Sequence, residues 1–252
     1  MPVKRLVMSL MIAFAGISLI VISARLLAHN SATMVGSDGK PLNGMAPLMV
    51  VFPAHSPPQK RVVSAILTLP RISSNRSWYA NWVMITGYSP TDSSQQVFVQ
   101  VGLIRQPQKN DALHLFIAFQ RPTDGKSIHF VDLGKVAEGA HHFSIALDSS
   151  NEVNAEMDGR LVEKPLHIDM KDAYAQIGPE VHAEGDTLSG SIRNPDVMAG
   201  TVHTLINPAN VCYFDNRGVR LIPTRRGAYV ASGSLNQLLP SSFRGKCAAF
   251  SM

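Results

Sequence analysis

The sequence predicts an all-β protein built as an antiparallel sandwich. Several short segments of residues 97–162 alternate apolar and polar side chains, as strands with one buried face do. The last two segments, 153–157 and 160–162, are joined by Asp158-Gly159, a dipeptide that favours the tight turn of a hairpin. Beyond the N-terminal leader no stretch keeps a 3.6-residue apolar period for three turns, so we expect little helix.

The N-terminus carries an apolar segment long enough to cross a membrane. Lys4 and Arg5 precede residues 6–24, which contain no charged side chain. At 1.5 Å per residue this run matches a hydrocarbon core of ~30 Å. Residues 1–28 are therefore either a transmembrane signal-anchor helix, which we favour because bulky residues stand where a cleavage site needs small ones, or a cleaved signal peptide. Either leader predicts an extracytoplasmic body, periplasmic or at the cell surface.

The remainder of the chain divides into a spacer and a folded domain. Glycine and proline recur through residues 29–60 too often for a regular element, so this range is predicted to be a stalk. Residues 48–52 form an apolar island inside it, which is predicted to be either an edge strand or part of the linker. Residues 61–252 are expected to form one sandwich domain, because their number suits one domain better than two.

Charge argues against a nucleic-acid partner. The chain has 23 Lys+Arg and 18 Asp+Glu. Three of the basic residues and none of the acidic ones lie in the leader, which leaves the exported part with a net charge of only +2. Nucleic-acid binding needs a basic stripe, and a nearly balanced surface does not provide one.

The two cysteines, Cys212 and Cys247, both lie in the exported part. In an oxidising compartment we expect them to form a disulfide. A metal site is the weaker alternative, because no Cys-x-x-Cys pair or histidine-rich pair accompanies them. His114, His129 and His142 fall in predicted strands without a metal-binding spacing, and no Gly-x-Ser-x-Gly elbow or glycine-rich phosphate loop is present. We expect no metal and no cofactor.

The order of the elements resembles the concanavalin-A-like β-sandwich, or jelly roll. Within that group, residues 82–192 are similar to the eqolisins, which are glutamic peptidases, and to their bacterial relatives. Three segments carry the likeness: residues 81–87, NWVMITG, are similar to the family's WVGIDG; residues 98–103, FVQVGL, to its ILQTG strand; and residues 175–180, AQIGPE, to its AEFIIE segment. The turn around Glu138 is similar to an acidic turn of the family. Gln100 then takes the place of the family's catalytic glutamine and Glu180 that of its catalytic glutamate.

This resemblance implies an acid glutamic endopeptidase, in which the two side chains project from neighbouring strands into one solvent-reached groove. A carboxylate can take a proton from water, and an amide can donate to the developing oxyanion. The chain departs from the family at residues 118–122, AFQRP, where the family has an aromatic substrate strand. Gly178-Pro179 is also expected to break the strand that carries Glu180. We therefore expect a sandwich that lacks catalysis.

The sequence favours an exported, membrane-tethered module that binds a glycan or a peptide on a concave sheet. Its expected ligand contacts are aromatic, because flat amphipathic rings pack on both kinds of ligand: Trp78, Tyr79, Trp82 and Tyr88. Trp82 opens an apolar strand, which favours core packing, whereas Trp78 and Tyr79 follow polar residues and are expected to be exposed. The alternatives are the glutamic endopeptidase acting through Gln100 and Glu180 and a structural envelope protein.

Overall fold

The structure is a computed structural model, and it describes residues 44–52, 59–125, 127–183, 185–224, 227–236 and 239–248. All of them belong to the unit formed by residues 43–252. The predicted leader and most of the predicted stalk lie outside the described residues. Within the described ranges, no helix has the length and apolar character needed to cross a bilayer.

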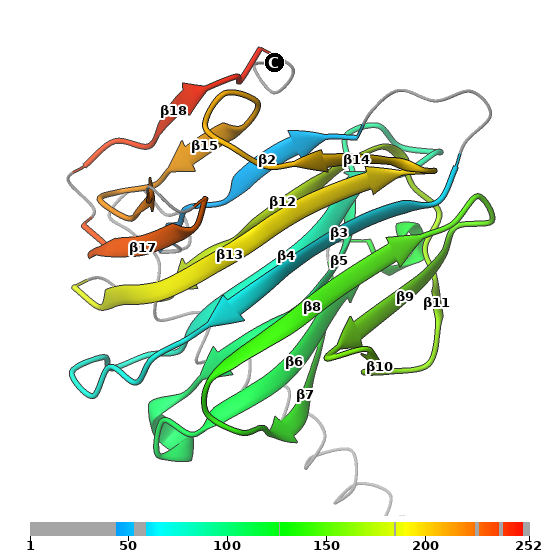
Figure 1. Cartoon of the computed structure of the whole chain (residues 1–252). Coiled ribbons are helices and arrows are strands. Elements are labelled where there is room, and N and C mark those ends of the chain that lie inside the picture. The colour runs from blue at the N-terminus through cyan, green and yellow to red at the C-terminus, as the bar shows by residue number, and fades with distance from the viewer. Residues whose placement is uncertain are drawn as a thin grey trace, which may run out of the picture. The chain divides into compact units, whose positions relative to one another are not determined.

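Two antiparallel sheets face each other (Figure 1). The first sheet runs in the order β18 (Ser242–Gly245), β15 (Cys212–Asp215), β2 (Leu48–Val51), β12 (Lys171–Val181), β4 (Tyr79–Tyr88), β5 (Gln96–Arg105), β6 (Leu113–Gln120) and β7 (His129–Lys135), and β1 (Gly44–Met45) pairs with β12. The second runs in the order β10 (Arg160–Leu161), β9 (Glu152–Met157), β8 (Ala140–Leu147), β3 (Arg61–Thr68), β13 (Thr187–Ala199), β17 (Tyr229–Ser234) and β16 (Arg220–Pro223). β11 (Leu166–His167) pairs with β9, and β14 (Val202–Leu205) pairs with β13. The only helices in the described residues are the 3-10 turns η1 (Pro107–Lys109) and η2 (Pro122–Asp124). The expected all-β antiparallel sandwich is confirmed.

Strand alternation gives each face of the first sheet a different role. The side-chain amide of Asn81 donates to the carbonyl oxygens of Thr68 (3.0 Å) and Ser191 (3.1 Å), which belong to the second sheet. The odd-numbered residues of β4 therefore face the second sheet, and Val83 and Ile85 are fully buried there. The even-numbered residues point away from it. We call the face that carries Trp82, Gln100 and Glu180 the outer face.

One rim of the sandwich is held by a buried arginine. Arg105, at the end of β5, is 1% exposed and donates to the carbonyl oxygens of Leu69 (2.8 Å) and Asp111 (2.6 Å). It also forms a two-point ion pair with Glu138. The Glu138 side chain is mostly exposed, so the acidic turn that resembles the eqolisins serves here to neutralise a buried guanidinium.

The sheet begins inside the stretch predicted to be a stalk. β2 lies between β12 and β15, so it is an interior strand of the first sheet, neither an edge strand nor a linker. Its residues Leu48, Met49 and Val50 are buried. Burial of this apolar island outweighs the turn-forming residues around it.

Gly178 and Pro179 do not interrupt the strand that carries Glu180, which corrects the expectation from sequence. β12 pairs with β4 continuously through both residues. Pro179 lies where β1 has ended and β2 has not begun, and its carbonyl oxygen accepts the amide of Ala46 (3.1 Å). Since this gap needs no amide donor from Pro179, the strand tolerates it. Gly178 is required by close approach, because a Cβ there would lie 2.6 Å from the Cα of Pro47.

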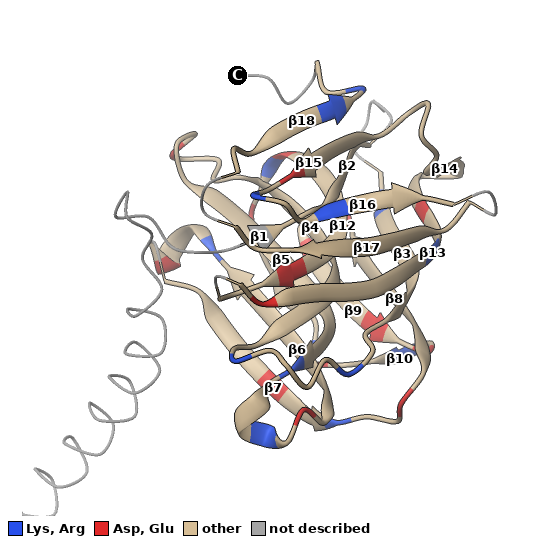
Figure 2. Ribbon diagram, turned by 90° about the vertical axis from the view of Figure 1, so that its left-hand side faces the viewer, with Lys and Arg blue, Asp and Glu red and all other residues tan. Residues whose placement is uncertain are grey.

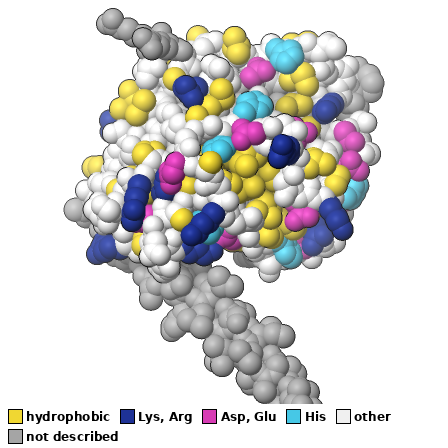
Figure 3. Space-filling model, turned by 60° about the horizontal axis from the view of Figure 1, so that its bottom comes forward, with side chains coloured by type: hydrophobic (Ala, Val, Ile, Leu, Met, Phe, Trp, Pro, Cys, Tyr) yellow, Lys and Arg dark blue, Asp and Glu magenta, His cyan; other side chains and the backbone are white. Residues whose placement is uncertain are grey.

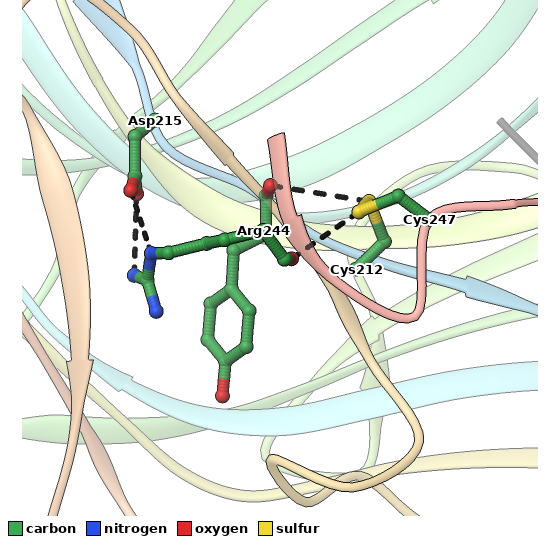
Figure 4. The surroundings of a disulfide bond; sticks show 5 residues. Cys212, Asp215, Arg244 and Cys247 are labelled. Carbon is green, nitrogen blue, oxygen red and sulfur yellow. Dashed lines mark hydrogen bonds and ion pairs between the residues drawn. A yellow bond between two sulfur atoms is a disulfide. The ribbon is translucent and has the colours of Figure 1, made fainter. Parts of the chain in front are cut away.

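Two local predictions are confirmed. Asp158 (φ 52°) and Gly159 (φ 76°) form the tight turn between β9 and β10, and Met157 pairs with Arg160. Cys212 and Cys247 form a disulfide with their Cα atoms 4.7 Å apart, which fastens the C-terminal segment beside β15 (Figure 4).

The surroundings of the disulfide add further contacts to this end of the first sheet. Arg244 of β18 pairs with Asp215 of β15 (2.6 Å), and its guanidinium lies 4.0 Å from the centre of the Tyr213 ring (Figure 4). The disulfide, the ion pair and the ring contact therefore all join β15 to the segment at β18.

Candidate functional site

The two residues that the eqolisin resemblance selects lie on the same face of the first sheet. Glu180 on β12 is opposite Ala80 on β4, and Gln100 on β5 is opposite Met84 of that same strand. Trp82 lies between these two positions along β4. Glu180, Trp82 and Gln100 thus form a diagonal across three neighbouring strands, which brings together residues that are far apart in the sequence.

Glycines on both sides make room for Trp82 in this diagonal. Gly178 on β12 and Gly102 on β5 are its two cross-strand neighbours. A Cβ at Gly102 would lie 2.3 Å from the carbonyl oxygen of Asn81 and 2.7 Å from the Cα of Trp82. Any larger residue at 102 would push β4 away and tilt the indole. The indole is fully buried on the outer face.

The carboxyl group of Glu180 is the most perturbed acid of the outer face. Burial raises its pKa to about 7, and interactions with the side chains of Trp82 and Gln100 oppose this rise without cancelling it. The Gln100 side chain favours the ionised form of the carboxyl group, as the Trp82 side chain does. The indole Nε1 of Trp82 makes no hydrogen bond of standard geometry within the described residues, so its effect comes from proximity to the carboxyl group.

The expectation was that the side chains of Gln100 and Glu180 project into a solvent-reached groove, but in the described part of the chain both are buried. Gln100 and Glu180 are each only 8% exposed. They share the outer face, but both lie beneath its surface.

An apolar cluster surrounds the pair. It comprises Ala80, Trp82, Met84, Ile104, Phe116 and Ala118, with Trp78 and Phe98 packed against it. These side chains exclude water from the carboxyl group, which is why its neutral form is favoured. Phe116 also stacks on Phe130 of the edge strand β7, with ring centroids 5.4 Å apart, so the apolar surface reaches the edge of the sheet.

His182 completes the end of the site nearest Glu180. Its ring meets that of Trp78 edge-on, with centroids 4.5 Å apart. Burial lowers the pKa of His182 to about 4, although the negative charge of Asp186 acts in the opposite direction. The imidazole is therefore neutral at pH 7. Its Nδ1 atom is buried and has no hydrogen-bond partner among the described residues.

A buried carboxylate fixes the loop that carries Trp78. Asp186 is 2% exposed and accepts the backbone amides of Arg76 (3.0 Å) and Ser77 (2.9 Å). Asn75 makes three hydrogen bonds with Thr187. Its side-chain amide donates to the carbonyl oxygen (2.7 Å), and its Oδ1 accepts from the backbone amide (2.9 Å) and the hydroxyl group (3.2 Å). The position of Trp78 beside His182 is therefore built by residues of β13 and the turn before it.

The opposite end of the outer face holds a second polar group. His114 on β6 contacts Asp132 on β7 through Nδ1 (2.9 Å). Asp132 also pairs with Lys109 and accepts the backbone amide of Gly134 (2.8 Å). Burial acts to raise the pKa of Asp132, but these hydrogen bonds outweigh it and lower the pKa to about 2. The group joins the edge strand to its neighbour.

Of the four aromatic residues predicted to contact a ligand, two are partly exposed on the outer face and two are fully buried. Trp78 and Tyr88 are half-buried, and alternation along β4 places both on the outer face. Tyr79 is not exposed, contrary to expectation. It points toward the second sheet, is fully buried, and its hydroxyl accepts the amide of Ile72 (2.7 Å). Trp82 is buried, as its position at the start of an apolar strand indicated.

Strand β6 ends in the segment where the sequence departs from the eqolisins, and it places no aromatic ring directly opposite Gln100. Phe119 lies opposite Val99, on the face directed toward the second sheet, and stacks on His129 with centroids 4.9 Å apart. The outer-face neighbour of Gln100 on β6 is Ala118. Sequence reasoning missed His182, although alternation from Glu180 would have placed it on the same face.

Electrostatically the described surface is mixed. Basic and acidic residues are scattered over both sheets and their loops (Figure 2). In the view of Figure 3, hydrophobic side chains gather near the middle of the visible face, with histidines and charges of both signs around them. No group of three or more metal-ligating side chains occurs among the described residues.

Comparison with the solved structure of a glutamic peptidase supports the fold assignment. Scytalido-glutamic peptidase, solved with a peptide-based transition state analogue, is similar with a TM-score of 0.51 and 12% identity, over 77% of this chain and 100% of that one. An alginate lyase from Pseudomonas aeruginosa has a TM-score of 0.45 and 14% identity, over 65% and 70% of the two chains. No protein-family model and no curated sequence matches the chain. The protein thus shares the jelly-roll sandwich of a glutamic peptidase.

Proposed function

We propose that this protein is an exported hydrolase of peptide bonds that acts through Glu180 and Gln100. One observation carries the proposal: a buried carboxyl group with a pKa of about 7 shares the outer face with a neutral amide that favours its ionised form. A pKa near the working pH is what a general base or acid needs. Strongly perturbed carboxyl groups beside a specific partner are concentrated at functional sites.

The chemistry follows from the two side chains. Ionised Glu180 takes a proton from a water molecule, which attacks the peptide carbonyl carbon. The side-chain amide of Gln100 donates a hydrogen bond to the carbonyl oxygen as it becomes negative. Glu180 then gives its proton to the leaving amine as the carbon–nitrogen bond breaks. The surrounding apolar cluster strengthens both electrostatic effects by excluding bulk water.

Hydrolysis of a glycan is less well supported, because glycosidases generally use two carboxyl groups about 5–9.5 Å apart. The other acids at this face are engaged elsewhere. Asp186 is bound by backbone amides, and Asp132 is paired with Lys109 and His114. Asp132 also lies four strands from β12, or ~19 Å at the usual strand spacing.

The pKa of Glu180 sets the working pH. A general base with a pKa of about 7 is protonated in acid, so the ratio kcat/KM should rise with pH through about 7. The eqolisin resemblance implies an acid optimum, whereas the burial of Glu180 favours a neutral one.

Cleavage of an unfolded protein tests the proposal. Reduced, carboxymethylated ribonuclease A should be cut near pH 7.5 and much less at pH 4. The Glu180→Gln variant should be inactive and folded. No cleavage by the wild type between pH 4 and 9, or equal cleavage by the variant, would remove the peptidase assignment.

A module that binds a peptide or a glycan without catalysis is the second candidate. Two observations favour it: Gln100 and Glu180 are each 8% exposed, and Phe119 faces away from them. Binding to a glycan array without cleavage of any polypeptide would support this candidate.

Export is part of the proposal. The disulfide agrees with an oxidising, extracytoplasmic compartment. We assign the tether to the leader, residues 1–28. A reporter fused after Met252 should be active only if it is one that works outside the cytoplasm, and activity of a cytoplasm-dependent reporter there would contradict the proposal.

A further inference from the structure

Two features of His182 call for a partner that the described chain does not supply. The residue is 8% exposed, and its Nδ1 atom is buried with no hydrogen-bond partner among the described residues. Buried polar atoms in native proteins nearly always have a partner, so an unpartnered one in a candidate site is a candidate for contact with a bound molecule. The neighbouring acid, Asp186, makes no hydrogen bond to Nδ1, and its oxygens accept the backbone amides of Arg76 and Ser77 instead.

The ring is held in a fixed position. Trp78 packs edge-on against it at 4.5 Å, and Trp78 itself is set by the bonds of Asp186 to the preceding loop. His182 also shares the outer face with Glu180, two residues earlier on the same extended segment. A group that contacts His182 therefore lies one side-chain position away from the carboxyl group.

We infer that His182 is a substrate-binding residue, which hydrogen-bonds the main chain of an unfolded polypeptide that reaches the site over Trp78. The inference rests on the proposed function and specifies how the substrate is held. A neutral imidazole offers one donor and one acceptor, and a peptide main chain offers both in alternation, so either tautomer finds a match. The apolar cluster beyond Trp82 suits the side chains of such a polypeptide.

The fluorescence of Trp78 can be used to measure binding at His182 directly. The protein has two tryptophans, Trp78 and Trp82, and both lie at this site. Because Trp78 is the partly exposed member of its pair with His182, a chain that reaches His182 must contact it. Intrinsic tryptophan fluorescence therefore reports binding without any need for catalysis.

The experiment is a fluorescence titration with reduced, carboxymethylated ribonuclease A, which contains no tryptophan. It is made in the Glu180→Gln background, so that cleavage cannot interfere. His182→Phe keeps a ring against Trp78 but removes both nitrogens, and should raise the Kd at least about tenfold. His182→Asn places an amide near the position of Nδ1 and should bind within about threefold of the parent. His182→Gln places its amide further out and should bind as weakly as His182→Phe.

The matched control is His167→Phe, which changes an exposed histidine of the second sheet and should leave the Kd unchanged. In the otherwise wild-type enzyme, His182→Phe should raise KM with little change in kcat, because it removes ground-state contact rather than chemistry. Comparing His182→Asn with His182→Gln keeps the test decisive if the phenylalanine variant does not fold.

The outcomes separate the two proposals. Binding that depends on His182 without cleavage by the wild type would sustain the inference and overturn the peptidase. If cleavage depends on Glu180 but the Kd is the same in all three His182 variants, the peptidase assignment stands and the inference about His182 is overturned. No fluorescence response to the polypeptide in the parent would overturn the inference.

Discussion

Gln100 and Glu180 lie on the two strands that flank β4 and share the outer face of the first sheet, where the Gln100 side chain favours the ionised form of the Glu180 carboxyl group. The diagonal passes over Trp82, which Gly102 and Gly178 accommodate on either side. A buried carboxyl group in this position affects both chemistry and stability, because the same desolvation that raises its pKa is present in the resting protein.

Glu180→Gln should stabilise the protein at high pH. The pKa of Glu180 is raised from 4.5 to about 7, so its contribution to stability is fully present below about pH 4.5 and is lost as pH rises through about 7. At pH 8 the variant should have a free energy of unfolding higher by up to ~3 kcal/mol, because each tenfold change in proton affinity corresponds to about 1.36 kcal/mol. At pH 4 the two proteins should be similar. Urea unfolding at both pH values measures this.

The matched control for this prediction is Glu163→Gln, which replaces an exposed glutamate and should have little effect at either pH. An equal stability change from Glu180→Gln at pH 4 and pH 8 would show that Glu180 is not ionised differently in the folded state.

Gln100→Ala should slow catalysis without unfolding the protein. Removal of one oxyanion donor costs about 10²–10³ in kcat in enzymes that use such donors. KM should change little, because the bond forms as charge develops on the carbonyl oxygen. Gln106→Ala, in the loop after β5, is the control and should retain full activity. Unaltered kcat in Gln100→Ala would assign Gln100 a structural role.

Gly159→Val should destabilise the second sheet at its edge. Gly159 has a φ of 76° and Asp158 one of 52°, and a β-branched residue is strained in that region. The free energy of unfolding should fall by more than ~1 kcal/mol. Gly39→Val in the predicted stalk should have no such effect. Equal melting temperatures for the two variants would contradict the importance of the hairpin turn.

The stability contributed by the contact between His141 and Asp158 at this hairpin should depend on pH. Burial lowers the pKa of His141, but bonds to Asp158 (2.7 Å) and the Ala137 carbonyl oxygen (2.9 Å) outweigh burial and raise it. Burial raises the pKa of Asp158, but its bonds to His141 and His142 outweigh burial and lower it. The His141 contribution is therefore lost as pH rises through its raised pKa, and the Asp158 contribution as pH falls through its lowered pKa.

Asp158→Asn should accordingly cost most stability between about pH 4 and pH 6.5, the range in which the ordinary pKa values leave both groups charged. Melting temperatures of the wild type and Asp158→Asn across pH 3–9 measure the difference. A difference that stays constant with pH would exclude an ionic contribution from this pair.

Reduction of the disulfide should destabilise the protein. Cys212 and Cys247 are separated by 35 residues, and closing a loop of that length contributes ~4 kcal/mol on the chain-entropy model. Thiol labelling of denatured, unreduced protein should find no free cysteine. Two labelled thiols in freshly purified protein would contradict the pairing.

Much of the sandwich follows from local patterns. The alternating runs at 97–103 and 113–119 became β5 and β6, and Asp158-Gly159 became a hairpin turn. These predictions succeed because alternation and turn conformation depend on neighbouring residues. Alternation also places Trp78 and Trp82 on one face and Tyr79 on the other, so the buried position of Tyr79 was open to prediction from the sequence.

Other features depended on contacts between distant segments. The apolar residues 48–51 lie among turn-forming residues, and only pairing with β12 and β15 makes them an interior strand. Pro179 is tolerated in β12 because the gap between β1 and β2 lies beside it. No local pattern encodes that gap.

The sequence by itself determined the class of fold, the hairpin and, through resemblance, the pair Gln100 and Glu180. Only the tertiary structure decided that the two side chains share one buried face, that burial raises the pKa of Glu180 to about 7, and that Trp78 packs against His182 on that face. The reason is physical: strand pairing is specified by short-range alternation, whereas desolvation of a carboxyl group is the sum of contributions from several strands.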